Sequence, residues 1–349
     1  MRRAQASTVA RQPAIRGRVR RVFSGHALNA IGRSTALGLL AAAAAAPAPS
    51  PSAPSPRPVF ESRLSLVYVT VTVQDRAGRV VADLPASAFE VREDGQPRPI
   101  SVFSRGGDEG LDLDVALLLD TSGSMTSELQ SAQRAALAVL EKIPRLRRRT
   151  VISFDTDIRF WKPEADPMAL LSEVMAARPP DGASAIRSAV AAGIEDLRRG
   201  GSARGALILL SDGVDFGSQV SETQLFRTIE GANVGIYPIP FVPLGWASGP
   251  STYRPGTVGR SGGGFPTTPD TLAARGFLTR LANASGGLVL LPARHRLAGA
   301  LDRLLEELAS QYVIGFAPAA ATPGRSHRLE VRVADRRLKV RHRERYLSR

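Results

Sequence analysis

The residues of this chain best suited to chemistry begin at Asp120, which is followed by Ser122 and Ser124 at alternate positions. One carboxylate and two hydroxyls spaced in this way can converge on a single point in a tight turn. A hard cation such as Mg²⁺ prefers oxygen ligands at about 2.0–2.1 Å and usually keeps several waters. The spacing therefore permits a magnesium site, although Asp and Ser are also favoured as helix caps.

A second group of oxygen-bearing side chains occurs later in the chain. Asp212 follows an apolar run in Ser211-Asp212-Gly213, and Ser184 begins another helical pattern. A second strand that ends in a carboxylate favours a metal site over a cap, because ligands of open α/β sheets bind beyond the carboxyl ends of the strands. The candidate metal ligands are Asp120, Ser122, Ser124, Ser184 and Asp212.

The elements that must position these residues alternate between strands and helices. The apolar run before Asp120 is typical of a strand buried on both faces. The predicted strands cover 113–119, 151–154, 158–161, 206–210, 234–241 and 288–291, and the predicted helices cover 126–142, 168–178, 184–198, 221–231, 271–284 and 294–309. This alternation predicts an α/β fold, a doubly wound and mostly parallel sheet with helices on both faces. Residues 242–270, rich in Gly, Pro, Ser and Thr, are predicted to be a flexible insertion.

With these motifs, roughly residues 112–310 resemble the von Willebrand factor type A (VWFA) domain, a Rossmann-like fold. The metal-ion-dependent adhesion site (MIDAS) of that family joins an Asp-x-Ser-x-Ser motif to a Thr and an Asp from later loops. Asp120, Ser122 and Ser124 match the motif, and Asp212 matches the distant carboxylate. Ser184 stands at the Thr position, where it keeps the hydroxyl but lacks the methyl group that restricts the rotamer.

Short strands are predicted on both sides of this central domain. They cover 64–73, 79–82, 88–92, 100–103, 312–316, 327–333 and 338–342, with a hairpin turn at 93–95. Neither group alone has enough strands to bury its alternating faces, so we expect one smaller β-sandwich with the VWFA domain inserted in it. Phe89 to Gly95 also resembles a Phe-Glu-Val-x-Glu-Asp-Gly stretch of VWFA-related bacterial secreted proteins.

The N-terminal region has the composition of an export signal. Residues 1–60 contain nine arginines and no acidic residue, and an alanine-rich segment over 34–46 is too short for a spanning helix of about 20 residues. A twin-arginine signal, a downstream start codon and a mitochondrial-type presequence are alternatives to a secretory signal. The expected organisation is a signal-like segment at 1–46, a Pro/Ala/Ser-rich linker at 47–60, sandwich strands at 61–107, the VWFA domain at 111–310 and sandwich strands at 311–349.

The formal net charge of +14 does not by itself predict nucleic-acid binding. Eight of the 46 basic residues lie within 1–46, and without them 38 basic residues face 32 acidic ones. The remaining excess lies in the last 25 residues, without interleaved aromatic side chains of the stacking kind. We therefore expect a solvated strand face and no nucleic-acid surface. The chain has no cysteine, which excludes disulfides, thiol catalysis and thiolate zinc sites.

Several enzyme classes lack their required residues in this sequence. Ser122 stands where a haloacid dehalogenase-type phosphatase has its second Asp, and no Gly-x-x-x-x-Gly-Lys stretch exists. Neither Ser122 nor Ser124 lies in a Gly-x-Ser-x-Gly elbow. No histidine is placed to act as a general base, and the four are predicted to be surface side chains: His26, His295, His327 and His342.

Three further aspartates have simpler expected roles. Asp155 and Asp157 are predicted to be turn formers. Asp215, three residues after Asp212, is predicted to be a solvated loop carboxylate rather than a group that tunes the metal.

The resemblance implies a secreted or periplasmic, envelope-associated protein-binding module without a transmembrane segment. Its MIDAS would hold Mg²⁺, or another divalent cation such as Mn²⁺, and bind an exposed acidic residue of a protein partner. Two aspartates neutralise a divalent cation and hydroxyls add no charge, so the site can accept an anionic ligand. The alternative is a metal-dependent hydrolase, for which the sequence offers a metal site but no positioned base or nucleophile; we expect no enzyme.

Overall fold

The computed structural model describes residues 66–106, 108, 113–142, 146–161, 166–177, 182–241, 269–291, 297–319 and 322–348. All of them belong to one compact unit, Glu61–Arg349. The predicted signal-like segment, the linker and nearly all of the predicted insertion at 242–270 lie outside the described residues.

A five-stranded sheet in the order β7-β6-β5-β8-β9 occupies the centre of the α/β domain. Its strands are β5 (Leu113–Asp120), β6 (Leu146–Phe154), β7 (Ile158–Trp161), β8 (Gly205–Ser211) and β9 (Val234–Pro240). β5 pairs in parallel with β6 and β8, β8 pairs in parallel with β9, and β7 is an antiparallel edge strand. The sheet is therefore mixed and mostly parallel, and every residue of its middle strand, β5, is buried.

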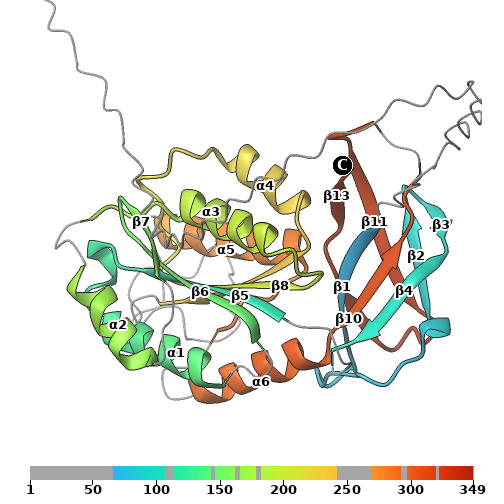
Figure 1. Cartoon of the computed structure of the whole chain (residues 1–349), viewed down its shortest axis with the longest axis horizontal. Coiled ribbons are helices and arrows are strands. Elements are labelled where there is room, and N and C mark those ends of the chain that lie inside the picture. The colour runs from blue at the N-terminus through green and yellow to red at the C-terminus, as the bar shows by residue number, and fades with distance from the viewer. Residues whose placement is uncertain are drawn as a thin grey trace, which may run out of the picture. The chain divides into compact units, whose positions relative to one another are not determined.

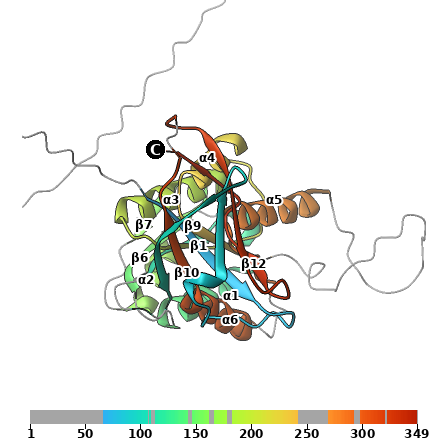
Figure 2. The same ribbon diagram turned by 90° about the vertical axis from the view of Figure 1, so that its right-hand side faces the viewer.

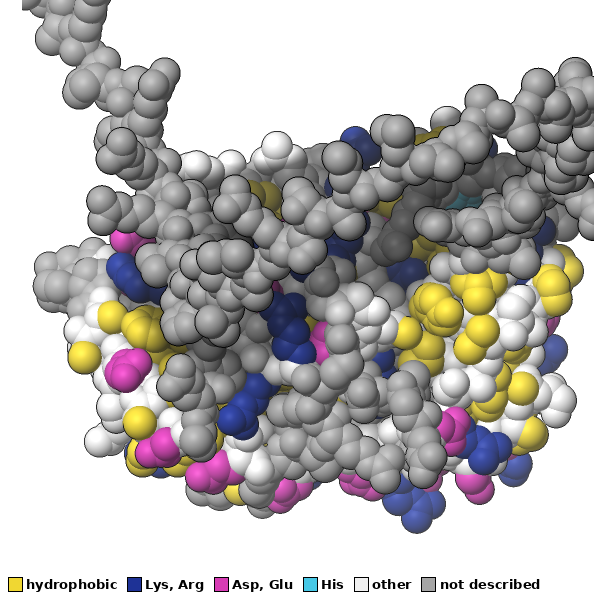
Figure 3. Space-filling view, in the orientation of Figure 1, with side chains coloured by type: hydrophobic (Ala, Val, Ile, Leu, Met, Phe, Trp, Pro, Cys, Tyr) yellow, Lys and Arg dark blue, Asp and Glu magenta, His cyan; other side chains and the backbone are white. Residues whose placement is uncertain are grey.

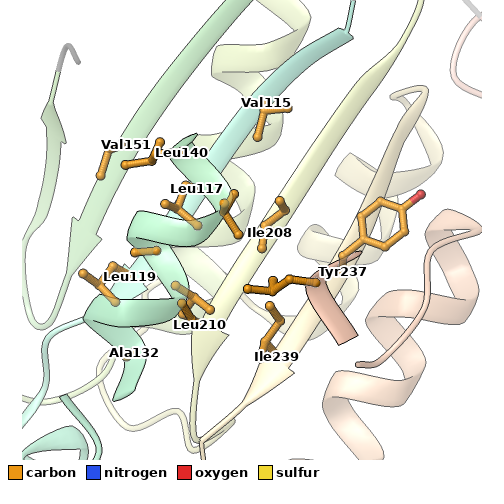
Figure 4. Packing of buried hydrophobic residues seen from close by; sticks show 14 of the residues in the cluster. Val115, Leu117, Leu119, Ala132, Leu140, Val151, Ile208, Leu210, Tyr237 and Ile239 are labelled. Atoms are coloured by element: carbon orange, nitrogen blue, oxygen red, sulfur yellow. The ribbon is translucent and has the colours of Figure 1, made fainter. Parts of the chain in front are cut away.

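Helices cover both faces of this sheet (Figure 1). They are α1 (Leu129–Lys142), α2 (Pro167–Ala176), α3 (Ile186–Gly200), α4 (Glu222–Glu230), α5 (Pro269–Ser285) and α6 (Leu297–Ser310). Successive residues of β5 point to opposite faces, so Leu117 and Leu119 pack with α1, α2 and α6, whereas Ala116 and Leu118 pack with α3, α4 and α5. Figure 4 shows the first of these two cores, in which α1 lies over β5 and β8.

Two antiparallel sheets are built from both ends of the described chain, in the orders β12-β1-β10-β4 and β13-β11-β2-β3. Their strands are β1 (Val67–Gln74), β2 (Phe89–Glu93), β3 (Gln96–Arg98), β4 (Ile100–Arg105), β10 (Tyr312–Phe316), β11 (Ser326–Val333), β12 (Lys339–Arg341) and β13 (Arg345–Leu347). β1 pairs with β10 and β2 pairs with β11, so strands far apart in the sequence lie side by side (Figures 1 and 2). Val71 and Val91, one from each sheet, belong to a single hydrophobic cluster.

The hairpin between β2 and β3 turns where the sequence predicts it. Asp94 and Gly95 have φ values of 49° and 83°, the two positive values that a type I′ turn requires. Gly tolerates this conformation without steric cost, and Asp is among the few other residues that do.

Two predicted strands are wrong. Residues 79–82 contribute only an isolated bridge between Gln74 and Val80, because the Asp75 carboxylate accepts the amides of Ala77 and Arg79 and shapes a turn. Residues 288–291 form no strand in the described structure, although the Leu290 amide donates to the Pro238 carbonyl at 2.8 Å. Conversely, β3 and β13 were not predicted, because three residues are too few to show an alternating pattern.

Buried and partly buried polar groups join the antiparallel sheets to the α/β domain. Arg343 donates to the carbonyls of Ala232 at 2.8 Å and Tyr68 at 2.6 Å. Asn233 and Thr70 form two hydrogen bonds. The Thr70 amide donates to Asn233 Oδ1 at 3.1 Å, and Asn233 Nδ2 donates to the Thr70 hydroxyl at 3.0 Å. None of the described helices has the length and apolar character needed to span a membrane.

Candidate metal centre

The candidate site begins at the carboxyl end of β5, the middle strand of the sheet. Asp120 is the last residue of that strand and is buried. The amide of Ser122 donates to Asp120 Oδ1 at 3.0 Å, and the hydroxyl oxygens of Ser122 and Ser124 are 3.2 Å apart. The Asp-x-Ser-x-Ser turn therefore gathers its three oxygen-bearing side chains before α1 begins.

Ser184 meets Asp120 from a different part of the chain. Its hydroxyl donates to Asp120 Oδ2 at 3.0 Å. The loop that carries it is held by neighbouring segments, because Ala183 N donates to Thr156 Oγ1 at 3.1 Å and Ala185 N donates to the Asp155 carbonyl at 3.1 Å. The loop before α3 and the turn between β6 and β7 thus position this hydroxyl together.

Ser211 also contacts Asp120, and the sequence analysis did not include it among the ligands. Its hydroxyl donates to Asp120 Oδ2 at 2.6 Å and accepts from the Gly213 amide at 3.0 Å. The register of β5 and β8 pairs Leu119 with Leu210, so the next residue of each strand leaves the sheet at the same edge. The sequence signal that could have identified Ser211 is its position, directly after the apolar run and one residue before Asp212.

Asp212 interacts with Asp120 through its charge. Its carboxylate is buried and accepts the Val214 amide at 2.9 Å. Burial raises the pKa of Asp120 to about 6, and the charge of Asp212 raises it too, whereas hydrogen bonds from Ser122 and Ser211 lower it. The two carboxylates are thus close enough to affect each other electrostatically.

The chemistry of this donor set fits a hard divalent cation. The described residues contain no group of three or more His, Cys, Asp or Glu side chains that could hold a metal, so any ion at Asp120 would depend on hydroxyls as well. Oxygen-only ligands suit Mg²⁺ and Mn²⁺. A buried carboxylate whose negative charge is disfavoured by burial and by a neighbouring carboxylate is stabilised by a divalent cation.

Asp155 supports the site from the β6–β7 turn. Its Oδ1 accepts the Asp157 amide at 2.9 Å, which is the expected turn-forming bond. In addition, the buried carboxylate accepts from Arg159 at 2.7 Å and from the Thr121 hydroxyl at 3.2 Å. Thr121 directly follows Asp120, so this contact ties the turn to the candidate site.

The prediction that Asp215 is a solvated loop carboxylate is wrong. Its Oδ2 accepts the Arg187 amide at 2.9 Å and the Ser218 hydroxyl at 2.7 Å, and it lies 3.2 Å from Arg187 Nε. A carboxylate that accepts an amide in the first turn of α3 acts as a helix cap from outside the helix. Asp215 therefore anchors the loop after Asp212 to the helix that follows Ser184.

The prediction of surface histidines is wrong for the two that the structure describes. His327 is buried, with Nδ1 2.9 Å from Asp94 Oδ2 and its ring stacked on Tyr346. His342 accepts the Val331 amide at Nε2 and bonds the Arg343 carbonyl through Nδ1. His327 belongs to β11, and His342 lies in the link between β12 and β13. His26 and His295 are outside the described residues.

The basic C-terminal strands carry paired charges. On β11, Arg332 and Glu330 are 2.8 Å apart, and on β2, Arg92 and Glu90 are 2.6 Å apart. The register places Glu330 opposite Arg92 and Arg332 opposite Glu90. In Figure 3, side chains of both charges lie near the lower edge of the described part of the face. This pattern is that of an ion-paired, solvated strand face.

The comparisons with known proteins give a family-model match over part of the chain and several similar solved structures. Residues 115–214 match the family model described as von Willebrand factor type A domain. An aerotolerance-related membrane protein from Bacteroides fragilis NCTC 9343 is 15% identical, with a TM-score of 0.41 over 56% of this chain and 98% of that chain. A von Willebrand factor type A protein from Catenulispora acidiphila is 14% identical, with a TM-score of 0.40 over 74% and 71%. The PilB minor pilin from Streptococcus sanguinis is 12% identical, with a TM-score of 0.39 over 58% and 63%. No curated protein matches the chain.

Proposed function

From the premise that this chain contains a von Willebrand factor type A domain, we propose that it is a metal-dependent protein-binding module of the adhesion type. The observation that supports the proposal most directly is the meeting of three segments at Asp120. Ser122, Ser184 and Ser211 each donate a hydrogen bond to its carboxylate from a different segment. A fold that gathers hydroxyls around a buried carboxylate supplies oxygen ligands at the edge of the sheet where α/β proteins bind ligands.

The proposed ligands of Mg²⁺ or Mn²⁺ are the five residues of the sequence motif, Asp120, Ser122, Ser124, Ser184 and Asp212, with Ser211 orienting Asp120. When bound, the cation supplies a position for an external oxygen ligand. Because two carboxylates only neutralise a divalent cation, a partner's carboxylate approaches a site that carries no net negative charge. The partner is therefore a protein that presents an exposed Asp or Glu.

We infer two features of the surrounding protein. The antiparallel sheets of residues 61–107 and 311–349 form one β-sandwich, because residues of both share a hydrophobic cluster, and residues 111–310 are inserted in it.

The composition of residues 1–46 supports export to the periplasm, the cell envelope or the medium. N-terminal sequencing of the exported protein tests the second feature, and retention of Arg2 in a cytoplasmic product would contradict it.

Metal binding is tested first, by calorimetric titration of the purified protein with MnCl₂ and MgCl₂. The wild type should bind one ion, and Asp120→Ala should abolish that binding. Asp83→Ala is the matched control, because Asp83 is an exposed aspartate of the antiparallel region. Equal metal affinity in the wild type and Asp120→Ala would overturn the proposed site.

Partner binding is then measured against salt and chelator, with immobilised Asp-containing peptides and a DNA duplex as probes. A metal–carboxylate contact should vanish with EDTA and in Asp120→Ala, and it should depend little on salt. Binding to a polyanion through the basic strands would weaken steeply with salt and ignore the chelator. Binding that survives both EDTA and Asp120→Ala would place the functional surface elsewhere.

A further inference from the structure

Phe216 is an exposed aromatic residue in the loop that follows Asp212. Its exposed fraction is 79%, the highest among the exposed large hydrophobic residues of the described structure. Single apolar side chains on a protein surface are common and need no explanation. Phe216 differs from such isolated side chains because its backbone is hydrogen-bonded to Ser184, a candidate metal ligand.

The backbone of Phe216 is fixed to Ser184. The amides of Phe216 and Gly217 both donate to the Ser184 carbonyl, at 3.0 and 2.9 Å. The hydroxyl of the same Ser184 contacts Asp120. A Cβ at Gly217 would lie 3.6 Å from the Cβ of Ala183, which is itself exposed, so the two loops are in contact. Phe216 is therefore linked to Asp120 of the candidate metal site through a single residue, Ser184.

The side chain of the preceding residue holds the loop from its other side. Asp215 bonds the amide of Arg187 and both the amide and the hydroxyl of Ser218. Because the backbone of Phe216 is held in this way, the loop loses little backbone freedom when a partner covers the ring. Such rigid aromatic residues are typical anchors of protein interfaces.

Two arginines near this loop are paired with aspartates. Arg187 pairs with Asp215 at 3.2 Å, and Arg159 pairs with Asp155 at 2.7 Å. These pairs lower the electrostatic attraction that either arginine could offer to a second acidic group. Beside these paired charges, the exposed ring of Phe216 offers an apolar contact.

We propose that Phe216, with Ala183, selects partners that carry a bulky apolar side chain next to the acidic residue bound at the metal. The inference rests on the proposed function and specifies the partner as an acidic residue followed or preceded by a residue such as Leu or Phe. The metal requires a carboxylate on the partner. Phe216 favours a bulky apolar side chain at the partner residue next to that carboxylate.

The test uses the full chain, Mn²⁺ and three immobilised peptides that differ only at a central pair: Asp-Leu, Asp-Ser and Asn-Leu. The wild type should bind Asp-Leu about tenfold more tightly than Asp-Ser, a preference of about 1.4 kcal/mol. Asn-Leu should not bind, because it lacks the carboxylate. Phe216→Ala should bind Asp-Leu and Asp-Ser equally and keep the wild-type affinity for Asp-Ser.

Phe160→Ala is the matched control, because Phe160 is an exposed aromatic residue on the edge strand β7. It should keep the preference for Asp-Leu. Metal-dependent binding of both Asp peptides with equal affinity in the wild type would overturn the role of Phe216 and leave the proposed function standing. If neither Asp peptide bound in a metal-dependent way, the proposed function would fail, and this inference with it. Manganese titration of Phe216→Ala shows whether that variant retains an intact site.

Discussion

At the scale of single residues, Asp120 occupies an environment that disfavours its own charge. Burial and the charge of Asp212 raise its pKa, and only the hydroxyls and amide around it favour the ionised form. Functional sites often combine residues in this way at a cost in stability, because the charge is needed for binding. Ser184 makes its contact with Asp120 at 3.0 Å, so the smaller side chain at the Thr position retains the hydroxyl bond.

His342 illustrates how one half-buried residue links stability to pH. Its Nε2 accepts the Val331 amide at 3.0 Å, so the ring is neutral and Nδ1–H donates to the Arg343 carbonyl at 2.7 Å. Burial lowers the pKa of His342; the Arg343 carbonyl and the charges of Glu344 and Glu330 oppose this shift, and the charge of Arg343 adds to it. Protonation would place an N–H against the Val331 N–H.

We predict that His342 makes the protein less stable in acid. The unfolded chain, in which the histidine has its usual pKa of about 6.5, binds the proton more readily than the folded chain. This contribution is present above about pH 6.5 and is lost as the pH falls below it. Urea unfolding at about pH 7.5 and about pH 5.5 measures the loss, and His342→Gln should lose less on acidification. Equal losses in the variant and the wild type would contradict this role.

At the scale of elements, Gly286 and Gly287 explain why no strand follows α5. Gly286 has a φ of 76°, and a Cβ there would lie 2.6 Å from the Arg343 amide nitrogen. A Cβ at Gly287 would lie 1.9 Å from the carbonyl oxygen of Ile236 in β9. The chain thus crosses between β9 and the link from β12 to β13 at a distance that only glycine permits. The apolar residues that follow are consequently not aligned as a sixth strand.

Gly287→Ala should destabilise the protein by about 1–3 kcal/mol or more, because the methyl group would overlap the backbone of β9. Gly299→Ala is the control, since Gly299 lies in α6 and nothing lies within 4 Å of its Cβ position. That substitution should be neutral or stabilise the helix by up to about 1 kcal/mol. Thermal and urea unfolding compare the two variants. A Gly287→Ala protein as stable as the wild type would show that β9 can shift without cost.

At the scale of the whole described molecule, the antiparallel sheets and the α/β domain are joined by buried polar contacts. Arg343 comes from the segment between β12 and β13 and bonds carbonyls of both Tyr68 and Ala232. A buried guanidinium held by carbonyls is sensitive to substitution, because each carbonyl that it leaves behind loses its partner inside the protein. The two parts should therefore unfold together.

Arg343→Met, which keeps the apolar stem and removes the guanidinium, should cost about 2–4 kcal/mol. Arg337→Met is the control, because the ion pair of Arg337 with Asp335 is solvent-exposed and its loss should not change stability measurably. Urea unfolding followed by circular dichroism and by tryptophan fluorescence measures both the cost and whether the transitions coincide. Wild-type stability in Arg343→Met would show that these contacts do not couple the two parts.

Features that depend on local pattern could be predicted from the sequence alone. The alternation of strands and helices, the buried middle strand, the turn at Asp94-Gly95 and the Asp-x-Ser-x-Ser motif were all predicted from neighbouring residues, because periodicity and turn chemistry act over a few positions. The sequence also indicated that Ser184 and Asp212 belong with Asp120, through the resemblance to the VWFA family.

Only the tertiary structure decided which distant groups meet. Ser211 reaches Asp120 across 91 positions because the register of β5 and β8 brings both strand ends to one edge. Asp215, His327 and His342 were predicted to be exposed, but His327 is buried beside Asp94, Asp215 pairs with Arg187, and His342 is half-buried with its ring bonded to Val331. Burial and register are properties of the assembled sheets, so no local pattern around these residues could have specified them.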